Sequence, residues 1–548
     1  MSTDSGAVDE GRLSGHGGDL AVATLRHFGV EELFALSGGH IWAFLDAARS
    51  QGLRLIDVRH EQTAAFAAEG VAKLTRRPGV AALTAGPGVT NSVSAVSTAH
   101  FNGSPLVVLG GRAPTFRWGS GSLQELDHVP LLAPITKLAG TLTSPGEIPD
   151  RLHEAVRLAL TPHRGPVFLD FPIEVLVATA EVPVPRKREP ERAEPDSDAV
   201  AHVAHLLATS DRPVLVAGSD VYWERAEQAL RAFVERWRLP TVSNGLGRGC
   251  LPADHELAFG HIRPALRSDA DLVIVVGAPL DFRLGFGDFG KAEVIHIVDV
   301  PDRHARHVKL AAAPAGDLAE ILSALSQWPG DRRAREKWID QLQTIEQAAR
   351  ADGEPHLASD AEPIKPARVY GELRKVLDPD AIVVCDGGDF VSYGGKWLDS
   401  YQPGCWLDPG PFGCLGVGLG YAIAARVIHP ARQVVVLFGD GAAGFSLMDV
   451  DTLVRHDLPV VIVVGNNGIW GLEKHPMRLL YGTDVGADLQ AECRYDEVVR
   501  ALGGAGEIVS SPDEIRPALK RAFAAGAPYL VNVLTDPDDI YPRTTSPI

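Results

Sequence analysis

Two apolar runs in the last third of the chain, QVVVLF (433–438) and LPVVIVVG (458–465), flank a segment with apolar residues at helical spacing, GFSLMDVDTLVRH. Each run has the length of one buried strand. A strand, a helix and a second strand in this order close as a right-handed crossover, so the two strands are parallel and end at the same edge of a sheet. The feature therefore predicts an α/β fold in which helices cover a parallel sheet.

The same alternation recurs along the whole chain. Its 548 residues exceed the size at which one hydrophobic core keeps growing, so several domains are expected. A segment rich in proline and charge (182–197) and a charged, helical one (326–365) read as links between domains. We predict an α/β protein with three doubly wound parallel-sheet domains, at residues 1–182, 198–328 and 365–548. Strands are expected at 32–36, 54–58, 80–84 and 105–109, then at 214–218, 271–277 and 294–299, and finally at AIVVCDGG, QVVVLFGDG, LPVVIVVGNNG and PYLVNVL.

Charge and cysteine content limit the class of function. The formal net charge of -18 argues against nucleic acid and anionic membranes as partners. No apolar run approaches the roughly 20 residues needed to span a bilayer, and the polar N-terminus lacks the pattern of a secretory signal. The five cysteines are far apart, which favours a reduced, cytoplasmic chain. We therefore expect a small-molecule enzyme.

Polar groups follow both runs of the opening feature. GDG places Asp440 at the end of the first run, and NNG places Asn467 at the end of the second. A carboxylate, an amide oxygen and a backbone carbonyl, that of Ile469, suit magnesium, and small residues leave backbone N–H groups free for phosphate. Each motif alone is more often a simple turn. Together they predict a magnesium diphosphate site, whose cofactor-binding set is Gly439, Asp440, Gly441, Ala442, Ala443, Asn467 and Ile469.

GDG followed by NN resembles the diphosphate and magnesium signature of thiamine-diphosphate-dependent enzymes. The resemblance covers nearly the whole chain and is to the large, catalytic subunit type of acetolactate synthase, with local likeness to benzaldehyde lyase and 2-hydroxyacyl-CoA lyase. It implies a pyrimidine-binding, a middle and a diphosphate-binding domain in this order. It also implies a homodimer or homotetramer with the active site between subunits.

The resemblance assigns roles to particular residues. Glu61, in RHEQTAAFAAEG, would hydrogen-bond the pyrimidine ring of thiamine diphosphate. In GPFGCLGVGLG, Leu415 takes the place of the residue that wedges between the two cofactor rings, and Gly413 belongs to the same segment. His40, in SGGHIWAF, matches a histidine of benzaldehyde lyase and could move protons at the reacting carbon. Gln124, in GSLQEL, matches a glutamine near cofactor and substrate.

Four further residues are expected to line the substrate pocket: Gly39, Lys137, Trp470 and Leu472. The sequence after Asn467 lacks the tryptophan by which acetolactate synthases select the second substrate, and Trp470 instead resembles benzaldehyde lyase. In the middle domain, GAPLDFRLGFG (277–287) is similar to flavin-proximal and nucleotide-binding segments of the family. FAD is therefore a possible cofactor, without a role in electron transfer.

The resemblance implies an acetolactate synthase-like carboligase. Such an enzyme decarboxylates a 2-keto acid such as pyruvate and joins the resulting enamine to a second carbonyl compound, a step of branched-chain amino acid biosynthesis. One alternative is a lyase that cleaves 2-hydroxyketones or 2-hydroxyacyl-CoA, which His40 favours. Another is a cofactor-binding homologue without turnover. The acceptor and any regulatory small subunit stay open at this stage.

Overall fold

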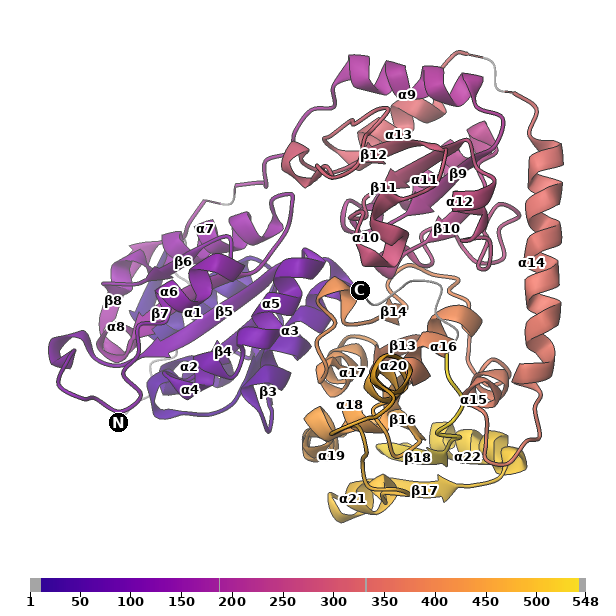
Figure 1. Cartoon of the computed structure of the whole chain (residues 1–548). Coiled ribbons are helices and arrows are strands. Elements are labelled where there is room, and N and C mark those ends of the chain that lie inside the picture. The colour runs from indigo at the N-terminus through magenta and orange to yellow at the C-terminus, as the bar shows by residue number, and fades with distance from the viewer. Residues whose placement is uncertain (1–10, 187, 331–332, 542–548) are drawn as a thin grey trace.

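The computed structural model describes residues 11–186, 188–330 and 333–541. Three parallel sheets from successive thirds of the chain form the centres of three domains, which Figure 1 colours from indigo through magenta to yellow. The predicted fold class is confirmed. Among the described residues, no helix combines the length and apolar character needed to cross a membrane.

The first domain holds a six-stranded parallel sheet in the order β3-β2-β4-β5-β7-β6. Successive residues of β4, such as Ala81 and Ala82, face two separate apolar cores, so helices bury both faces of the sheet. The strands are β2 (Glu32–Ala35), β3 (Arg54–Asp57), β4 (Gly79–Leu83), β5 (Leu106–Arg112), β6 (Ala139–Thr141) and β7 (Val167–Pro172), and the main helices are α1 (Gly17–His27), α2 (Trp42–Ser50), α3 (Glu61–Thr75), α5 (Val93–Asn102) and α7 (Ile148–Leu160). A separate antiparallel ribbon pairs β1 (Arg12–His16) with β8 (Thr179–Pro183).

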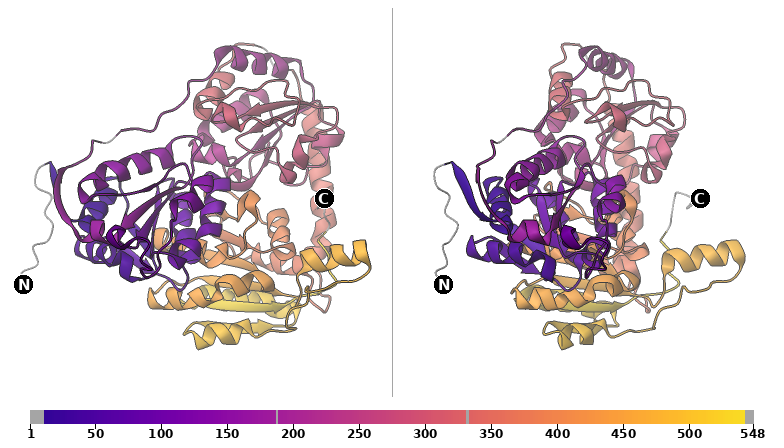
Figure 2. Two further views of the ribbon diagram at one scale, coloured as in Figure 1. Left: turned by 60° about the vertical axis from the view of Figure 1, so that its left-hand side comes forward. Right: turned by 90° about the vertical axis from the view of Figure 1, so that its left-hand side faces the viewer.

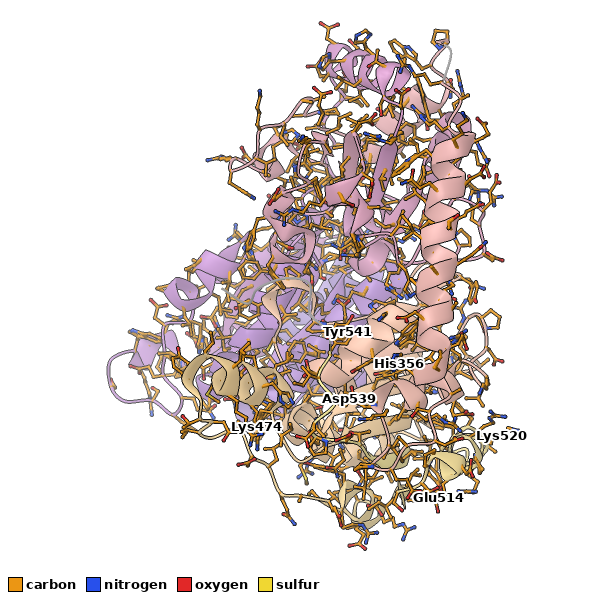
Figure 3. All side chains as sticks on the ribbon, turned by 45° about the vertical axis from the view of Figure 1, so that its right-hand side comes forward. His356, Lys474, Glu514, Lys520, Asp539 and Tyr541 are labelled. Atoms are coloured by element: carbon orange, nitrogen blue, oxygen red, sulfur yellow. The ribbon has the colours of Figure 1, made fainter. Side chains whose placement is uncertain are left out.

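The middle domain has a four-stranded parallel sheet in the order β10-β9-β11-β12. Its strands are β9 (Pro213–Ala217), β10 (Thr241–Ser243), β11 (Leu272–Val276) and β12 (Glu293–Ile297), and its main helices are α9 (Ser197–Thr209), α10 (Ser219–Trp223), α11 (Glu227–Trp237) and α13 (Leu318–Ser326). The helical link expected at 326–365 contains α14 (Glu336–Leu357), which runs along one side of the molecule from the middle to the third domain. Figure 3 marks His356 near the C-terminal end of this helix.

The third domain contains the opening feature within a six-stranded parallel sheet of order β14-β13-β15-β16-β18-β17. The strands are β13 (Ile382–Asp386), β14 (Trp406–Leu407), β15 (Val434–Gly439), β16 (Val461–Asn466), β17 (Ala505–Val509) and β18 (Tyr529–Leu534), and the helices include α15 (Pro366–Leu373), α16 (Asp389–Trp397), α17 (Val417–Ile428), α20 (Gly471–Tyr481), α21 (Tyr495–Ala501) and α22 (Pro512–Ala524). Every predicted strand is present. The expected crossover helix is divided into α18 (Asp440–Ser446), η9 (Leu447–Asp449) and α19 (Val450–Arg455).

Helices α3 and α17 pack together and join the first and third domains. Glycines allow their close approach: a Cβ on Gly70 would lie 2.7 Å from the Cβ of Ala424, and one on Gly420 would lie 2.5 Å from the Cβ of Phe66. Where the crossover helix breaks, the Asp449 carboxylate accepts hydrogen bonds from the first domain. This packing fixes the start of α3, and with it Glu61, relative to the third domain.

A buried polar cluster crosses the same interface. Glu69 and Lys73 on α3 are 0% and 2% exposed, and their charged groups lie 3.3 Å apart. Tyr421 on α17 donates to Glu69 at 2.7 Å and accepts from Lys73 at 2.9 Å. Because a buried charge is tolerated only when it is paired and hydrogen-bonded, the cluster specifies how the two domains dock.

Candidate active site

Asp440 and the Asn467 turn meet at the carboxyl ends of β15 and β16, which are parallel neighbours in the sheet. The Asp440 carboxylate accepts hydrogen bonds from the N–H groups of Gly468 at 2.7 Å and of Gly441 at 3.0 Å. The side-chain oxygen of Asn467 accepts from the N–H of Ile469 at 3.2 Å. The strand topology thus brings together the three predicted metal ligands, Asp440, Asn467 and Ile469. The side chains of Asp440 and Asn467 each accept a hydrogen bond from an N–H group of the turn.

The surroundings of Asp440 suit a cation. The side chain is almost fully buried, and within the part of the chain that the structure describes no lysine, arginine or histidine forms an ion pair with it. Burial raises the pKa of Asp440 to about 6, although the N–H groups of Gly468 and Gly441 oppose this. A buried carboxylate that lacks a positive partner is costly, and a divalent ion relieves that cost. The donor set of carboxylate, amide and carbonyl oxygens fits magnesium.

Trp470 and Leu472 cover glycine backbone around this edge. A Cβ on Gly441 would lie 2.4 Å from the indole ring of Trp470, and a Cβ on Gly388 would lie 2.6 Å from the side chain of Leu472. Phe445 meets the edge of the Trp470 ring at a centroid distance of 6.5 Å. These side chains form an apolar wall, and Ala442 and Ala443 are buried at the start of α18 beside it.

The turn that carries Leu415 is held by a residue that sequence reasoning missed. Asp386 ends β13 and is fully buried, and its carboxylate accepts hydrogen bonds from the N–H groups of Gly416 at 3.0 Å and Gly418 at 2.8 Å. Gly413 and Gly416 have positive φ, which glycine adopts without strain. The acidic residue at the end of the apolar run IVVCD was the available signal.

His40 and Gln124 come together in the first domain through Thr84. The Thr84 hydroxyl lies 3.5 Å from Nδ1 of His40 and donates to the side-chain oxygen of Gln124 at 3.4 Å. Burial lowers the pKa of His40, so its imidazole is predominantly neutral at pH 7. Gly39 precedes His40 in a 3-10 turn and faces open space. The side chains of His40 and Gln124 therefore belong to one cluster.

Glu61 begins α3 and is largely buried. Its carboxylate accepts a hydrogen bond at 3.0 Å from the side-chain amide of Asn91, which comes from the AGPGVTN turn after β4. Asn91 is a second residue that sequence reasoning did not single out. Among the described residues, no hydrogen bond or ion pair joins Glu61, His40 or Gln124 to Asp440 or Asn467.

Lys137 forms its hydrogen bonds outside the cluster of His40 and Gln124. Its ammonium group donates to the carbonyl oxygens of Thr161 at 2.6 Å and His163 at 2.7 Å, in the turn before β7. Burial lowers the pKa of Lys137 to about 8. Its hydrogen bonds do not reach the cluster of His40 and Gln124.

Comparisons with known proteins match all three domains. The descriptions are "Thiamine pyrophosphate enzyme, N-terminal TPP binding domain" for residues 15–131, "Thiamine pyrophosphate enzyme, central domain" for residues 200–325, and "Thiamine pyrophosphate enzyme, C-terminal TPP binding domain" for residues 386–533.

Full-length relatives are similar to the chain as well. It is 51% identical to the acetolactate synthase large subunit IlvG of Mycobacterium tuberculosis, with 100% of both chains covered. It is 33% identical to 2-hydroxyacyl-CoA lyase 2 of Caenorhabditis elegans, over 97% of this chain and 91% of the other. It is 32% identical to 2-hydroxyacyl-CoA lyase of Arabidopsis thaliana, over 95% of this chain and 96% of the other.

Proposed function

The chain belongs to the thiamine pyrophosphate enzyme family, and on that premise we propose that it is a carboligase of the acetolactate synthase type. It decarboxylates pyruvate or a similar 2-keto acid and joins the two-carbon unit to a second carbonyl compound, an activity that belongs to branched-chain amino acid biosynthesis. The observation that carries this proposal is the 51% identity to an acetolactate synthase large subunit over the full length of both chains.

Magnesium is proposed as the resident metal. Asp440 and Asn467 supply side-chain oxygens, and Ile469 supplies its carbonyl oxygen. The buried, cation-free surroundings of Asp440 support this assignment, as does the all-oxygen donor set. The N–H groups of Ala442 and Ala443, together with the backbone at Gly439 and Gly441, would form the adjoining diphosphate site.

Thiamine diphosphate, when bound, supplies the electron sink that makes loss of carbon dioxide from a 2-keto acid possible. Glu61 would hydrogen-bond the pyrimidine ring, and Asn91 fixes its carboxylate by donating to it. Leu415 would pack against the cofactor from the turn that Asp386 anchors. The neutral imidazole of His40 can accept a proton beside the reacting carbonyl group.

The substrate pocket is proposed to lie between these groups. Gly39 leaves room beside His40. Trp470 and Leu472 exclude water, and Gln124 orients the carbonyl compound. We place Lys137 at the outer rim, because its ammonium group binds the turn before β7. The residue that selects the acceptor differs from the acetolactate synthase pattern around Trp470, so the acceptor is the open part of the proposal.

The active site is proposed to form between two subunits of a homodimer or homotetramer. Among the residues described in one chain, the first-domain cluster has no bond to Asp440. Exposed apolar side chains offer contact surface, with Leu479 at 86%, Tyr481 at 75% and Phe116 at 73% exposure. Figure 2 shows α20, which carries Leu479 and Tyr481, projecting from the third domain. Figure 3 marks Lys474 on the same helix.

Complementation tests the shared site and the catalytic roles together. We expect Glu61→Gln and Asp440→Asn each to abolish acetolactate formation, whereas coexpression of the two restores about a quarter of the parent activity, since half of the random dimers hold one intact site. If heterodimers are shown to form and the coexpressed protein is still inactive, the shared site is refuted. Full activity of Glu61→Gln alone removes Glu61 from its role.

A lyase acting on 2-hydroxyacyl-CoA is the second candidate, because relatives of that name are about a third identical to the chain. Incubation with magnesium, thiamine diphosphate and pyruvate separates the two functions. We expect acetolactate and carbon dioxide. Absence of both, together with cleavage of a 2-hydroxyacyl-CoA, replaces the synthase assignment by the lyase. No product in either assay leaves a cofactor-binding protein without turnover.

FAD is proposed as a structural cofactor of the middle domain. Supporting it is a cavity that lies beside the carboxyl ends of β9, β11 and β12 and is lined by Arg283 and Arg303. The cavity also contains Asp220, with Asp299 next to it, and two carboxylates oppose a bare diphosphate. The proposed reaction needs no net electron transfer, so no step involves flavin. Visible absorbance of the purified protein tests for it.

A reducing compartment, the cytoplasm, is proposed as the location. The cysteines are all free thiols, among them Cys250, Cys385 and Cys405, which are buried. Purification from a cytoplasmic fraction checks this.

A further inference from the structure

Three metal-ligating side chains converge at the wall of the middle-domain cavity. His163 lies in the turn before β7 of the first domain, Asp220 lies in α10 directly after β9, and Asp299 follows β12. The Nδ1 atom of His163 is 2.9 Å from Oδ2 of Asp299 and 3.8 Å from Oδ1 of Asp220. One donor atom from each residue falls within 4.8 Å of the others. The cluster is separate from Asp440 and Asn467, which belong to the third domain.

The carboxylates of this cluster are only partly satisfied, since the hydrogen bond to Nδ1 of His163 reaches one oxygen of Asp299. Asp220 is 8% exposed, and over residues 11–186, 188–330 and 333–541 its carboxylate receives no hydrogen bond and lies 3.8 Å from Nδ1 of His163. The Oδ1 atom of Asp299 and the Nε2 atom of His163 are buried without a hydrogen-bond partner. Buried polar groups are normally satisfied, and two neighbouring carboxylates with one imidazole leave negative charge uncompensated.

The other charges around the cavity do not complete the cluster. Arg283 is paired with Asp281 at 2.7 Å, and Arg164 is paired with Glu224. Arg303 lines the cavity, but in the described part of the chain it forms no ion pair with either carboxylate. His296, which also lines the cavity, donates from Nε2 to the carbonyl oxygen of Ala278 at 3.0 Å, and burial lowers its pKa to about 4.

We propose that His163, Asp220 and Asp299 bind a first-row divalent cation such as Mn²⁺. Adjacent donors of an octahedral ion with bonds of about 2.1 Å lie about 3 Å apart and opposite donors about 4.2 Å apart, and the two donor distances of His163 fall close to this range. One imidazole and two carboxylates favour manganese over the all-oxygen chemistry of magnesium. The three ligands leave coordination positions directed to the cavity, where a phosphate or carboxylate ligand can bind.

The cation joins two domains. It links the loop before β7 in the first domain to two strand ends of the middle domain, and it neutralises the carboxylates that oppose a diphosphate in this cavity. Removing any ligand therefore weakens both metal retention and the docking of the middle domain.

The test uses the full chain with Mn²⁺ alone, without thiamine diphosphate. In the Asp440→Asn background, which lacks the active-site metal ligand, we expect one Mn²⁺ per chain by equilibrium dialysis and metal analysis. Adding Asp220→Asn or Asp299→Asn lowers the affinity at least tenfold. Asp288→Asn, an exposed carboxyl of the same domain, leaves it unchanged.

A spectroscopic measurement distinguishes the loss of a metal ligand from misfolding of the variant. Pulsed electron paramagnetic resonance of the bound Mn²⁺ shows nitrogen coupling in the Asp440→Asn protein, and His163→Gln removes the coupling. No bound Mn²⁺ in the Asp440→Asn protein, equal binding after Asp220→Asn, or a spectrum without nitrogen coupling overturns the proposal. None of these results affects the carboligase assignment, which is measured on the parent enzyme with magnesium and pyruvate.

Discussion

Asp386 is the residue whose protonation the structure makes most consequential for the third domain. Its carboxyl is 0% exposed and holds the turn bearing Leu415 through the N–H groups of Gly416 and Gly418. Burial raises its pKa from the ordinary 3.8 to about 7, while these two hydrogen bonds act in the opposite direction. The folded protein therefore keeps a proton on Asp386 that the unfolded chain releases near pH 4.

The sign of the pH effect follows from this difference. Between pH 4 and pH 7 the folded state binds one proton more than the unfolded state at this group, so its contribution to stability falls as pH rises and levels off above about pH 8. The full difference corresponds to about 4 kcal/mol, of which about 2 kcal/mol is lost between pH 5 and pH 7. Asp386→Asn has no such titration and can still accept a hydrogen bond from Gly418.

We expect the free energy of unfolding of Asp386→Asn to rise relative to the parent by about 2 kcal/mol between pH 5 and pH 7. Urea unfolding of the metal-free protein at several pH values, followed by tryptophan fluorescence, measures it. Asp380→Asn, which changes a more exposed carboxyl of the same domain, should follow the parent throughout. If Asp386→Asn loses stability with rising pH as steeply as the parent, Asp386 is not the titrating group and the reasoning fails.

Three further substitutions test the packing around the site. Lys73→Met leaves the Glu69 carboxylate without its cation and should cost about 3–5 kcal/mol in urea unfolding; an unchanged midpoint contradicts the pairing. Leu415→Ala should lower kcat by roughly tenfold to a hundredfold, and Leu415→Met should restore it, because methionine has a similar volume; equal rates in all three rule out the wedge. Gly441→Ala pushes a Cβ into an indole ring and should weaken thiamine diphosphate binding about tenfold or more, whereas Gly444→Ala, in the same helix with open space around it, should not. Fluorescence titration distinguishes the two glycine variants, and equal affinity refutes the contact.

Local patterns were sufficient to predict the strands and the meeting of Asp440 with the Asn467 turn. Asp440 and Asn467 each follow a buried strand, and parallel strands joined by a right-handed crossover end at one sheet edge. Their meeting is thus a consequence of strand order. The packing of α3 on α17 was not predictable in the same way, because it depends on glycines and alanines that are equally common in unrelated helices.

Residues that act through distant partners escaped prediction. Asn91 donates a hydrogen bond to Glu61 from another loop, and Asp386 accepts hydrogen bonds from a turn that follows it by about thirty residues in sequence. Because such partners are far apart in the chain, no periodic sequence pattern predicts their contact. For Lys137, the family motif predicts a place near the substrate, whereas its hydrogen bonds to carbonyl oxygens before β7 are visible only in the tertiary structure.

By itself, the sequence determined the α/β class, the order of the three domains and the meeting of Asp440 with the Asn467 turn at one edge of the third sheet, because hydrophobic periodicity and chain connectivity are local properties. Only the tertiary structure decided which buried charges found partners. Glu69 is satisfied by Lys73 and Tyr421 from two domains, whereas Asp220 and Asp299 are brought together with His163 and one oxygen of Asp299 has no hydrogen-bond partner. Compensation of buried charge depends on distances of a few ångströms between remote segments, and those distances are set by packing.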